Sequence, residues 1–129
     1  MIMKGLDTAR NAIGEFDFHE FRLLRELRVS VTPRSLVSVK IHPVVDVEIC
    51  LETESRQPPA RICLRFSEVR SLQIQELGGE ACIHGFDVVD VSDRQLEGIS
   101  WYVHDYEESV ISFWSKDAEV LAASAIAPR

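Results

Sequence analysis

Apolar and polar residues alternate along much of this chain, and residues 45–51 show the pattern most clearly. Every second position in that stretch is aliphatic, with Asp46, Glu48 and Cys50 in between. A two-residue period sends successive side chains to opposite faces of a β-strand. The stretch therefore predicts a strand with one face in the core and the other in solvent.

The same period recurs in several separated stretches, each of which predicts a strand. These stretches are residues 27–32, 37–41, 62–66, 71–75, 82–91, 99–104 and 110–114. The predicted fold class is mainly β, or α+β with minor helix. The chain should form a single domain over residues 1–129, with seven or eight mostly antiparallel strands in a sandwich or a curved sheet. Residues 1–17 are expected to form a short helical or irregular arm, and residues 121–129 a tail that makes a helical turn or frays.

Local signals refine this outline. Residues 7–13 predict a short helix, capped by Asp7 or Thr8 and ended by Gly14. Residues 67–68 are predicted to form a turn that separates the strands before and after them.

Both tryptophans and both tyrosines fall within residues 97–119, which predict a β-hairpin. Its arms, residues 99–104 and 110–114, flank a polar link short enough for a hairpin loop. The alternation assigns Trp101 and Phe113 to the core, where truncation of Trp101 to alanine should cost about 3–5 kcal/mol.

The second arm, residues 110–114, carries apolar side chains on both faces and no charge. One face can meet the core, but the Ala-rich tail is too small to cover a tryptophan on the other. These features predict a homodimer with Trp114 or Tyr102 at or near the interface.

The chain has a formal net charge of −7, and its acids gather in the C-terminal third. Nine acids lie between residues 87 and 119, against two bases, Arg94 and Lys116; the acids are Asp87, Asp90, Asp93, Glu97, Asp105, Glu107, Glu108, Asp117 and Glu119. Such a surface repels phosphate backbones, so a nucleic-acid partner is not expected. It would attract a basic protein, although solubility alone is the simpler reason for acidic charge.

The candidate partner-binding residues combine most of these acids with aromatic residues of the hairpin. They are Asp87, Asp90, Asp93, Glu97, Tyr102, Asp105, Glu107, Glu108 and Trp114. Aromatic side chains bring large contact areas, and a charged rim speeds association with an oppositely charged protein. The predicted partner is therefore a protein, and a basic one.

No apolar run approaches the roughly 18 residues that a membrane span needs, so no membrane partner is expected. Cys50, Cys63 and Cys82 are odd in number and form no C-x-x-C pair. They suggest neither a disulfide framework nor a zinc site, and the predicted location is the reducing cytoplasm.

The sequence contains no phosphate-binding loop, dinucleotide fingerprint, serine elbow or H-E-x-x-H motif, so an enzyme is disfavoured and no catalytic, cofactor-binding or metal-binding residue is assigned. None of the four histidines pairs at chelating spacing with another histidine or a cysteine. The alternative is a small enzyme or metal-dependent module around His19 and Glu20, with His104 as a distant contributor. That reading requires residues 18–20 to turn, because adjacent strand residues point to opposite faces.

The order of these segments carries a resemblance. Phe18-His19-Glu20 is followed by paired strands, by residues 62–72, and then by residues 101–106 and 111–120. In this order the chain resembles a group of small, largely uncharacterised bacterial β-rich proteins, some of which are similar to immunity proteins of polymorphic toxin systems. Those proteins usually carry His-Asp where this chain has His19 and Glu20. The resemblance implies a non-catalytic inhibitor that binds a toxin domain.

Overall fold

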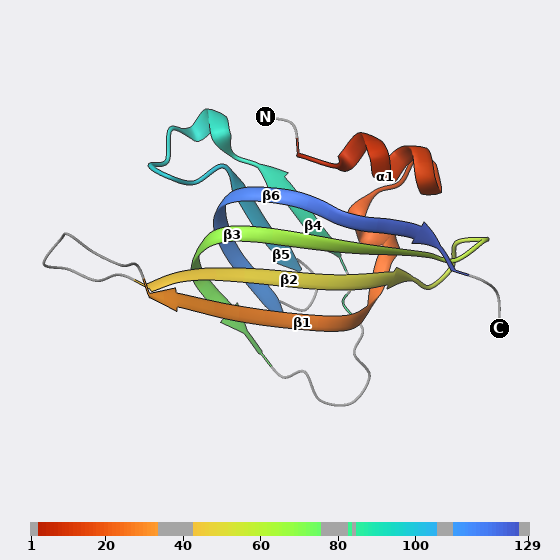
Figure 1. Ribbon diagram of the computed structural model, residues 1–129, viewed down its shortest axis with the longest axis horizontal. Helices are drawn as coiled ribbons and strands as arrows, with labels where there is room; N and C mark the ends of the chain where they lie inside the picture. Colours follow the sequence, from red (N-terminus) through yellow and green to blue (C-terminus); the bar gives the residue numbers. More distant parts are fainter. Residues whose placement is uncertain (1–2, 34–42, 76–82, 84, 106–109, 127–129) are drawn as a thin grey trace, which may run out of the picture.

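The computed structural model describes residues 3–33, 43–75, 83, 85–105 and 110–126, and it confirms a mainly β fold (Figure 1). Six antiparallel strands form one sheet in the order β1-β2-β3-β6-β5-β4. The strands are β1 (Phe21–Pro33), β2 (Pro43–Thr53), β3 (Ala60–Ile74), β4 (Phe86–Asp90), β5 (Trp101–Asp105) and β6 (Ile111–Ala125). The helix α1 (Leu6–Ile13) and the 3₁₀ turns η1 (Phe18–Glu20) and η2 (Ser92–Arg94) complete the described part.

The described residues form six strands, whereas the pattern predicts seven or eight. One reason is that the predicted strands at residues 62–66 and 71–75 are two halves of β3. The predicted turn at residues 67–68 is wrong. Glu68 and Ser71 adopt positive φ angles of 51° and 55°, and the β3–β6 register shifts between Arg70 and Gln73 instead of reversing. Such irregularities are β-bulges, which bend a strand without ending it. The strand predicted over residues 37–41 lies outside the described residues.

The predicted tail is also wrong in its first half, because β6 continues to Ala125. Its small residues pair with the start of β3, as far as Ala60 opposite Ala125. Alanine has a weak preference for strands, but a partner strand with open hydrogen-bonding groups overrides that preference.

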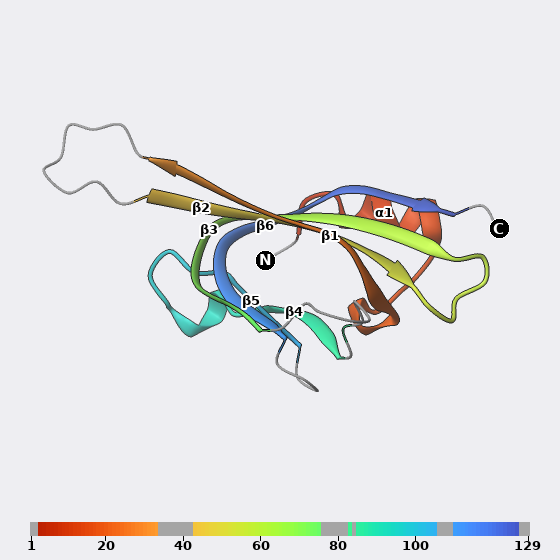
Figure 2. The ribbon, with the colours of Figure 1, turned by 90° about the horizontal axis from the view of Figure 1, so that it is seen from below.

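The sheet is strongly bent, as Figures 1 and 2 show, with β4 and β5 folded under the plane of the longer strands. The bend brings the segment before β4 back to the start of β1, where the amide of Ile83 donates a hydrogen bond of 2.7 Å to the carbonyl of Arg22. At the same place the rings of Phe18 and Phe86 lie 6.4 Å apart. The core fills the concave side between these two parts.

The core confirms the alternation read from the sequence. Trp101 is 6% exposed and Phe113 is fully buried, and the Phe113 ring meets Phe66 edge to face at 5.0 Å. Val47, Ile49 and Leu51, the inward positions of β2, are fully buried as well.

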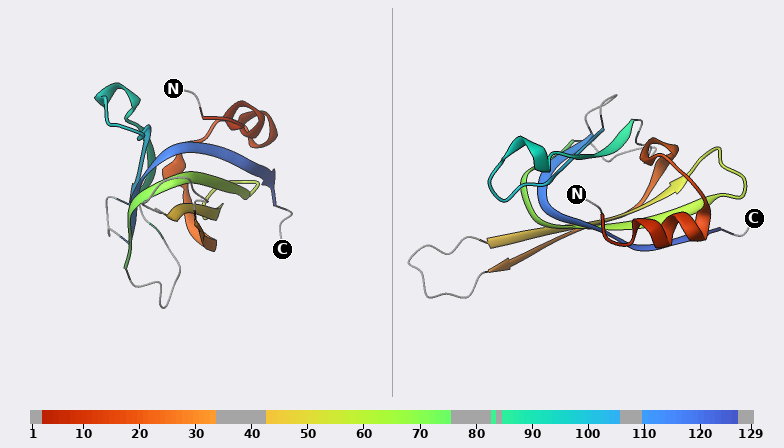
Figure 3. Two further views of the ribbon diagram at one scale, coloured as in Figure 1. Left: turned by 60° about the vertical axis from the view of Figure 1, so that its left-hand side comes forward. Right: turned by 90° about the horizontal axis from the view of Figure 1, so that it is seen from above.

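The helix α1 lies beside the far half of β6 (Figure 3). It ends at Gly14 as predicted, but it starts after Gly5 and not after Asp7 or Thr8. Just before the helix, the carbonyl of Lys4 accepts a hydrogen bond of 2.8 Å from the amide of Val120. A side chain on Gly5 would lie 2.5 Å from the Val120 carbonyl oxygen, and the φ of Gly5 is +84°, so this close approach requires glycine.

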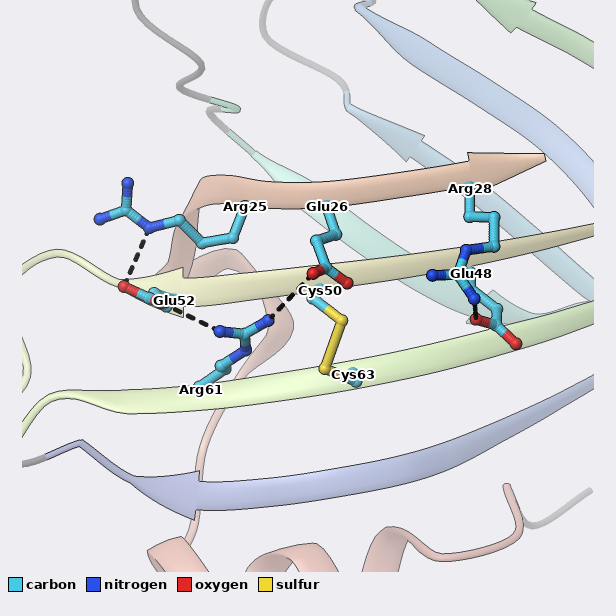
Figure 4. Close-up of polar contacts among 8 residues, drawn as sticks. All are labelled: Arg25, Glu26, Arg28, Glu48, Cys50, Glu52, Arg61 and Cys63. Atoms are coloured by element: carbon cyan, nitrogen blue, oxygen red, sulfur yellow. Dashed lines mark hydrogen bonds and ion pairs between the residues drawn. A yellow bond between two sulfur atoms is a disulfide. The ribbon is translucent and has the colours of Figure 1, made fainter.

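The prediction that the cysteines form no disulfide is wrong, because Cys50 and Cys63 are bonded (Figure 4). Their 13-residue separation matches no motif, but β2 and β3 pair so that the two residues stand directly opposite, with Cα atoms 4.1 Å apart. The sequence could not show this because the register of the hairpin decides it. This disulfide removes the reason for expecting a reducing compartment.

The outer surface of β1, β2 and β3 is charge-balanced (Figure 4). Arg25 and Arg61 lie 3.0 and 3.8 Å from Glu52, and Arg28 lies 3.7 Å from Glu48. Each exposed pair contributes little to stability. Together they leave the acidic register of β2 matched by basic residues on both neighbouring strands.

Candidate partner-binding site

Four residues on the outer face of the bent half of the sheet form one continuous line across four strands. Val89 of β4 pairs with Tyr102 of β5, Tyr102 with Trp114 of β6, and Trp114 with Arg70 of β3. Because Trp101 and Phe113 point into the core, the neighbouring Tyr102 and Trp114 must point outward. We call this line, Val89-Tyr102-Trp114-Arg70, the outer row.

Its aromatic side chains stack on one another. The rings of Tyr102 and Trp114 lie 4.2 Å apart at 29°, and His104 stacks on Tyr102 at 4.8 Å and 22°. All three side chains are half-buried. A stacked group of this kind offers a broad, flat contact area with hydrogen-bonding atoms at its edges.

Three acids lie on β4 and in the segment that follows it. Asp87, directly opposite His104 in the ladder, is half-buried, whereas Asp93 and Glu97 are exposed in the segment between β4 and β5. Arg70 Nη1 donates a hydrogen bond of 3.3 Å to the carbonyl of Glu97, which holds that segment at the end of the outer row. Unlike the acids of β2, these three carboxylates form no ion pair with another described residue.

The remaining predicted acids do not join this group. Asp90 is exposed at the end of β4, where its carboxylate accepts hydrogen bonds from the amide and hydroxyl of Ser92 at 2.9 and 2.6 Å. Asp105 is only 1% exposed and accepts a hydrogen bond of 3.4 Å from the amide of Val110, so it supports the hairpin from inside. Glu107 and Glu108 lie outside the described residues.

Residues 18–20 do turn, as the alternative hypothesis requires, but Glu20 is engaged in local structure. Its carboxylate accepts a hydrogen bond of 2.7 Å from the amide of Asp17 and lies 3.6 Å from Arg56. His19 is exposed on η1, whereas His104 stands in the aromatic stack on β5. No cluster of three or more metal-ligating side chains occurs among the described residues.

Sequence reasoning missed Arg70, Val89 and His104 as members of this surface. Val89 and His104 could have been found from the two-residue period of their strands, since each alternates with buried neighbours. Arg70 directly precedes the register shift between Arg70 and Gln73, and its place opposite Trp114 depends on a strand register that the sequence does not reveal.

Comparison with known proteins identifies a family. The family model described as Immunity protein PIM8 matches residues 10–120, which is most of the chain. No curated protein and no solved structure matches. Within the described part of the chain, no helix has the length and apolar character of a membrane span.

Proposed function

Because the chain belongs to the PIM8 immunity protein family, we propose that it is a non-catalytic inhibitor that binds and blocks a toxin domain. The family match carries this proposal, since it covers the strands that build the outer row. An immunity protein acts through a complex with a protein, and the chain offers a surface suited to one.

The proposed contact surface is the outer row with His104, Asp87, Asp93 and Glu97. Tyrosine, tryptophan and arginine are the residues that most often dominate binding energy in protein interfaces. All three types lie side by side here: Tyr102 lies between Val89 and Trp114, and Arg70 lies at the end of the row. The unmatched acids around them favour a toxin with a basic contact surface.

Co-expression tests the function directly. We expect the chain to protect cells from the toxin encoded beside its gene, and the purified pair to form a stable complex. Cells that die with or without the chain, together with the absence of a complex, would contradict the proposed role.

The proposed attraction between these acids and a basic toxin surface can be tested separately. The double variant Asp93→Asn with Glu97→Gln should slow association with the toxin roughly tenfold at low salt, because steering charges act on the association rate. The control, Glu26→Gln with Glu48→Gln, removes the same charge from the balanced face and should have little effect. Association that is equally fast for both variants, and unchanged by salt, would exclude a basic toxin surface.

The cytoplasmic location stays a proposal, and the Cys50–Cys63 disulfide argues against it, since disulfides persist mainly in oxidising compartments. Alkylation of free thiols in intact cells tests it. A chain held in the periplasm should leave Cys50 and Cys63 unlabelled. Labelling of both residues would show that the thiols are free and would indicate a reducing compartment.

A further inference from the structure

The strand β1 forms one end of the sheet and has an open edge. On that side its described partners amount to the single hydrogen bond from Ile83 to Arg22 at the beginning of the strand. The other end of the sheet is different, because β4 has only five residues and packs against η1. The far half of β1, with its partner β2, extends beyond the rest of the sheet (Figures 1 and 2). An edge strand of 13 residues presents, on its free side, a row of hydrogen-bonding groups to any strand of matching pattern.

Two valines in this far half are exposed on an otherwise buried face. Val29 and Val31 are 42% and 61% exposed, although Val47, directly opposite Val29, is fully buried. The outward positions between and beside them, Ser30 and Thr32, carry no charge. Natural edge strands are usually protected by charges, and this part of β1 lacks them after Arg28.

We infer that two copies of the chain pair through the free edges of β1, antiparallel about a two-fold axis at Ser30. In this register Val29 of each copy stands opposite Val31 of the other, and Arg28 opposite Thr32. No like charges face each other, whereas a self-pairing of β2 would align its acids. The contact is the same on both copies and closes as a dimer.

This interface replaces the one predicted at Trp114 and Tyr102. Those two rings cover each other by stacking at 4.2 Å and are half-buried in a single chain. Val31 has no such cover, since it is 61% exposed. The dimer also leaves the outer row free for a toxin, because β2 separates the β1 edge from β3, the nearest strand of the outer row.

Sedimentation velocity at tens of micromolar tests the dimer. The wild-type chain should sediment with twice its 14.6 kDa mass, and Val31→Lys should give the mass of a single chain. The control Leu121→Lys changes a leucine that is 47% exposed on β6, and it should remain a dimer. A wild-type monomer would overturn the proposal, as would a Val31→Lys dimer. If the wild-type chain is a monomer and Val31→Lys abolishes toxin binding, the edge of β1 binds the toxin and not a second copy.

Cross-linking tests the register. In a Cys82→Ser background, Ser30→Cys should form an intermolecular disulfide under mild oxidation, because residues opposite each other across an antiparallel pair have Cα atoms about 4.5–5.5 Å apart. The control Arg28→Cys places the two thiols four residues apart along the strands, or about 13 Å, and should not cross-link. Equal cross-linking of both variants, or of neither, would overturn the arrangement at Ser30.

Discussion

Replacing Phe113 by alanine is expected to lower the free energy of unfolding by about 3–5 kcal/mol. The ring is fully buried and meets Phe66 edge to face at 5.0 Å, so its removal leaves a cavity that the two packed halves of the sheet cannot close. Urea unfolding followed by circular dichroism measures the change. Since small domains are stable by about 5–15 kcal/mol, the loss is a large share of the total.

Two further variants make this result specific. Phe113→Leu keeps most of the volume and should cost less than about 1.5 kcal/mol. Trp101→Ala should fall near the lower end of the range, about 3 kcal/mol, because clefts of about 280 and 380 Å³ already border that side chain. A loss below about 0.5 kcal/mol for Phe113→Ala would mean that the bent sheet does not enclose this ring.

Truncation of Trp114 is expected to weaken toxin binding by about thirtyfold or more, which corresponds to a loss of about 2 kcal/mol. Trp114 stands between Tyr102 and Arg70 in the outer row, so its loss removes the centre of the proposed contact and one side of the stack. Calorimetric titration of the purified toxin with Trp114→Ala measures the affinity.

A matched control lies on the same strand. Leu121→Ala removes an exposed side chain from the half of β6 that does not pair with β5, and its affinity for the toxin should match that of the wild type. Urea unfolding of Trp114→Ala must show a folded chain, so that weak binding reports the surface. Unchanged affinity in a folded Trp114→Ala would remove the outer row from the toxin interface.

Much of the fold could be predicted from the two-residue period. It identified β2, the pairing of β5 with β6, and the burial of Trp101 and Phe113. It failed where a strand continues through residues that usually break one. The bulge between Arg70 and Gln73 and the Ala-rich end of β6 both depend on a neighbouring strand that supplies hydrogen bonds, which no local pattern reveals.

The sequence predicted some residues of the candidate site, but it did not predict how they are arranged. Tyr102 and Trp114 follow from alternation, since each adjoins a core residue. The row that joins them to Arg70 requires the register of three strand pairs. The charge of Asp105 predicted a surface position. In the structure Asp105 is buried, because it lies on the same face of β5 as Trp101 and Val103. Along a strand, the parity of a position is a better guide to exposure than its charge.

The contact between Gly5 and Val120 has a consequence for how this domain can be shortened. The family match runs from residue 10 to residue 120, yet residues 4 and 5 contact the far half of β6, beyond the part that pairs with β5. A chain trimmed to the matched range would lose α1's first turn and leave the remaining end of β6 as a new unprotected edge. Residues 4 and 5 contact β6, and residues 122–125 pair with the start of β3, so a shortened chain should retain both flanks.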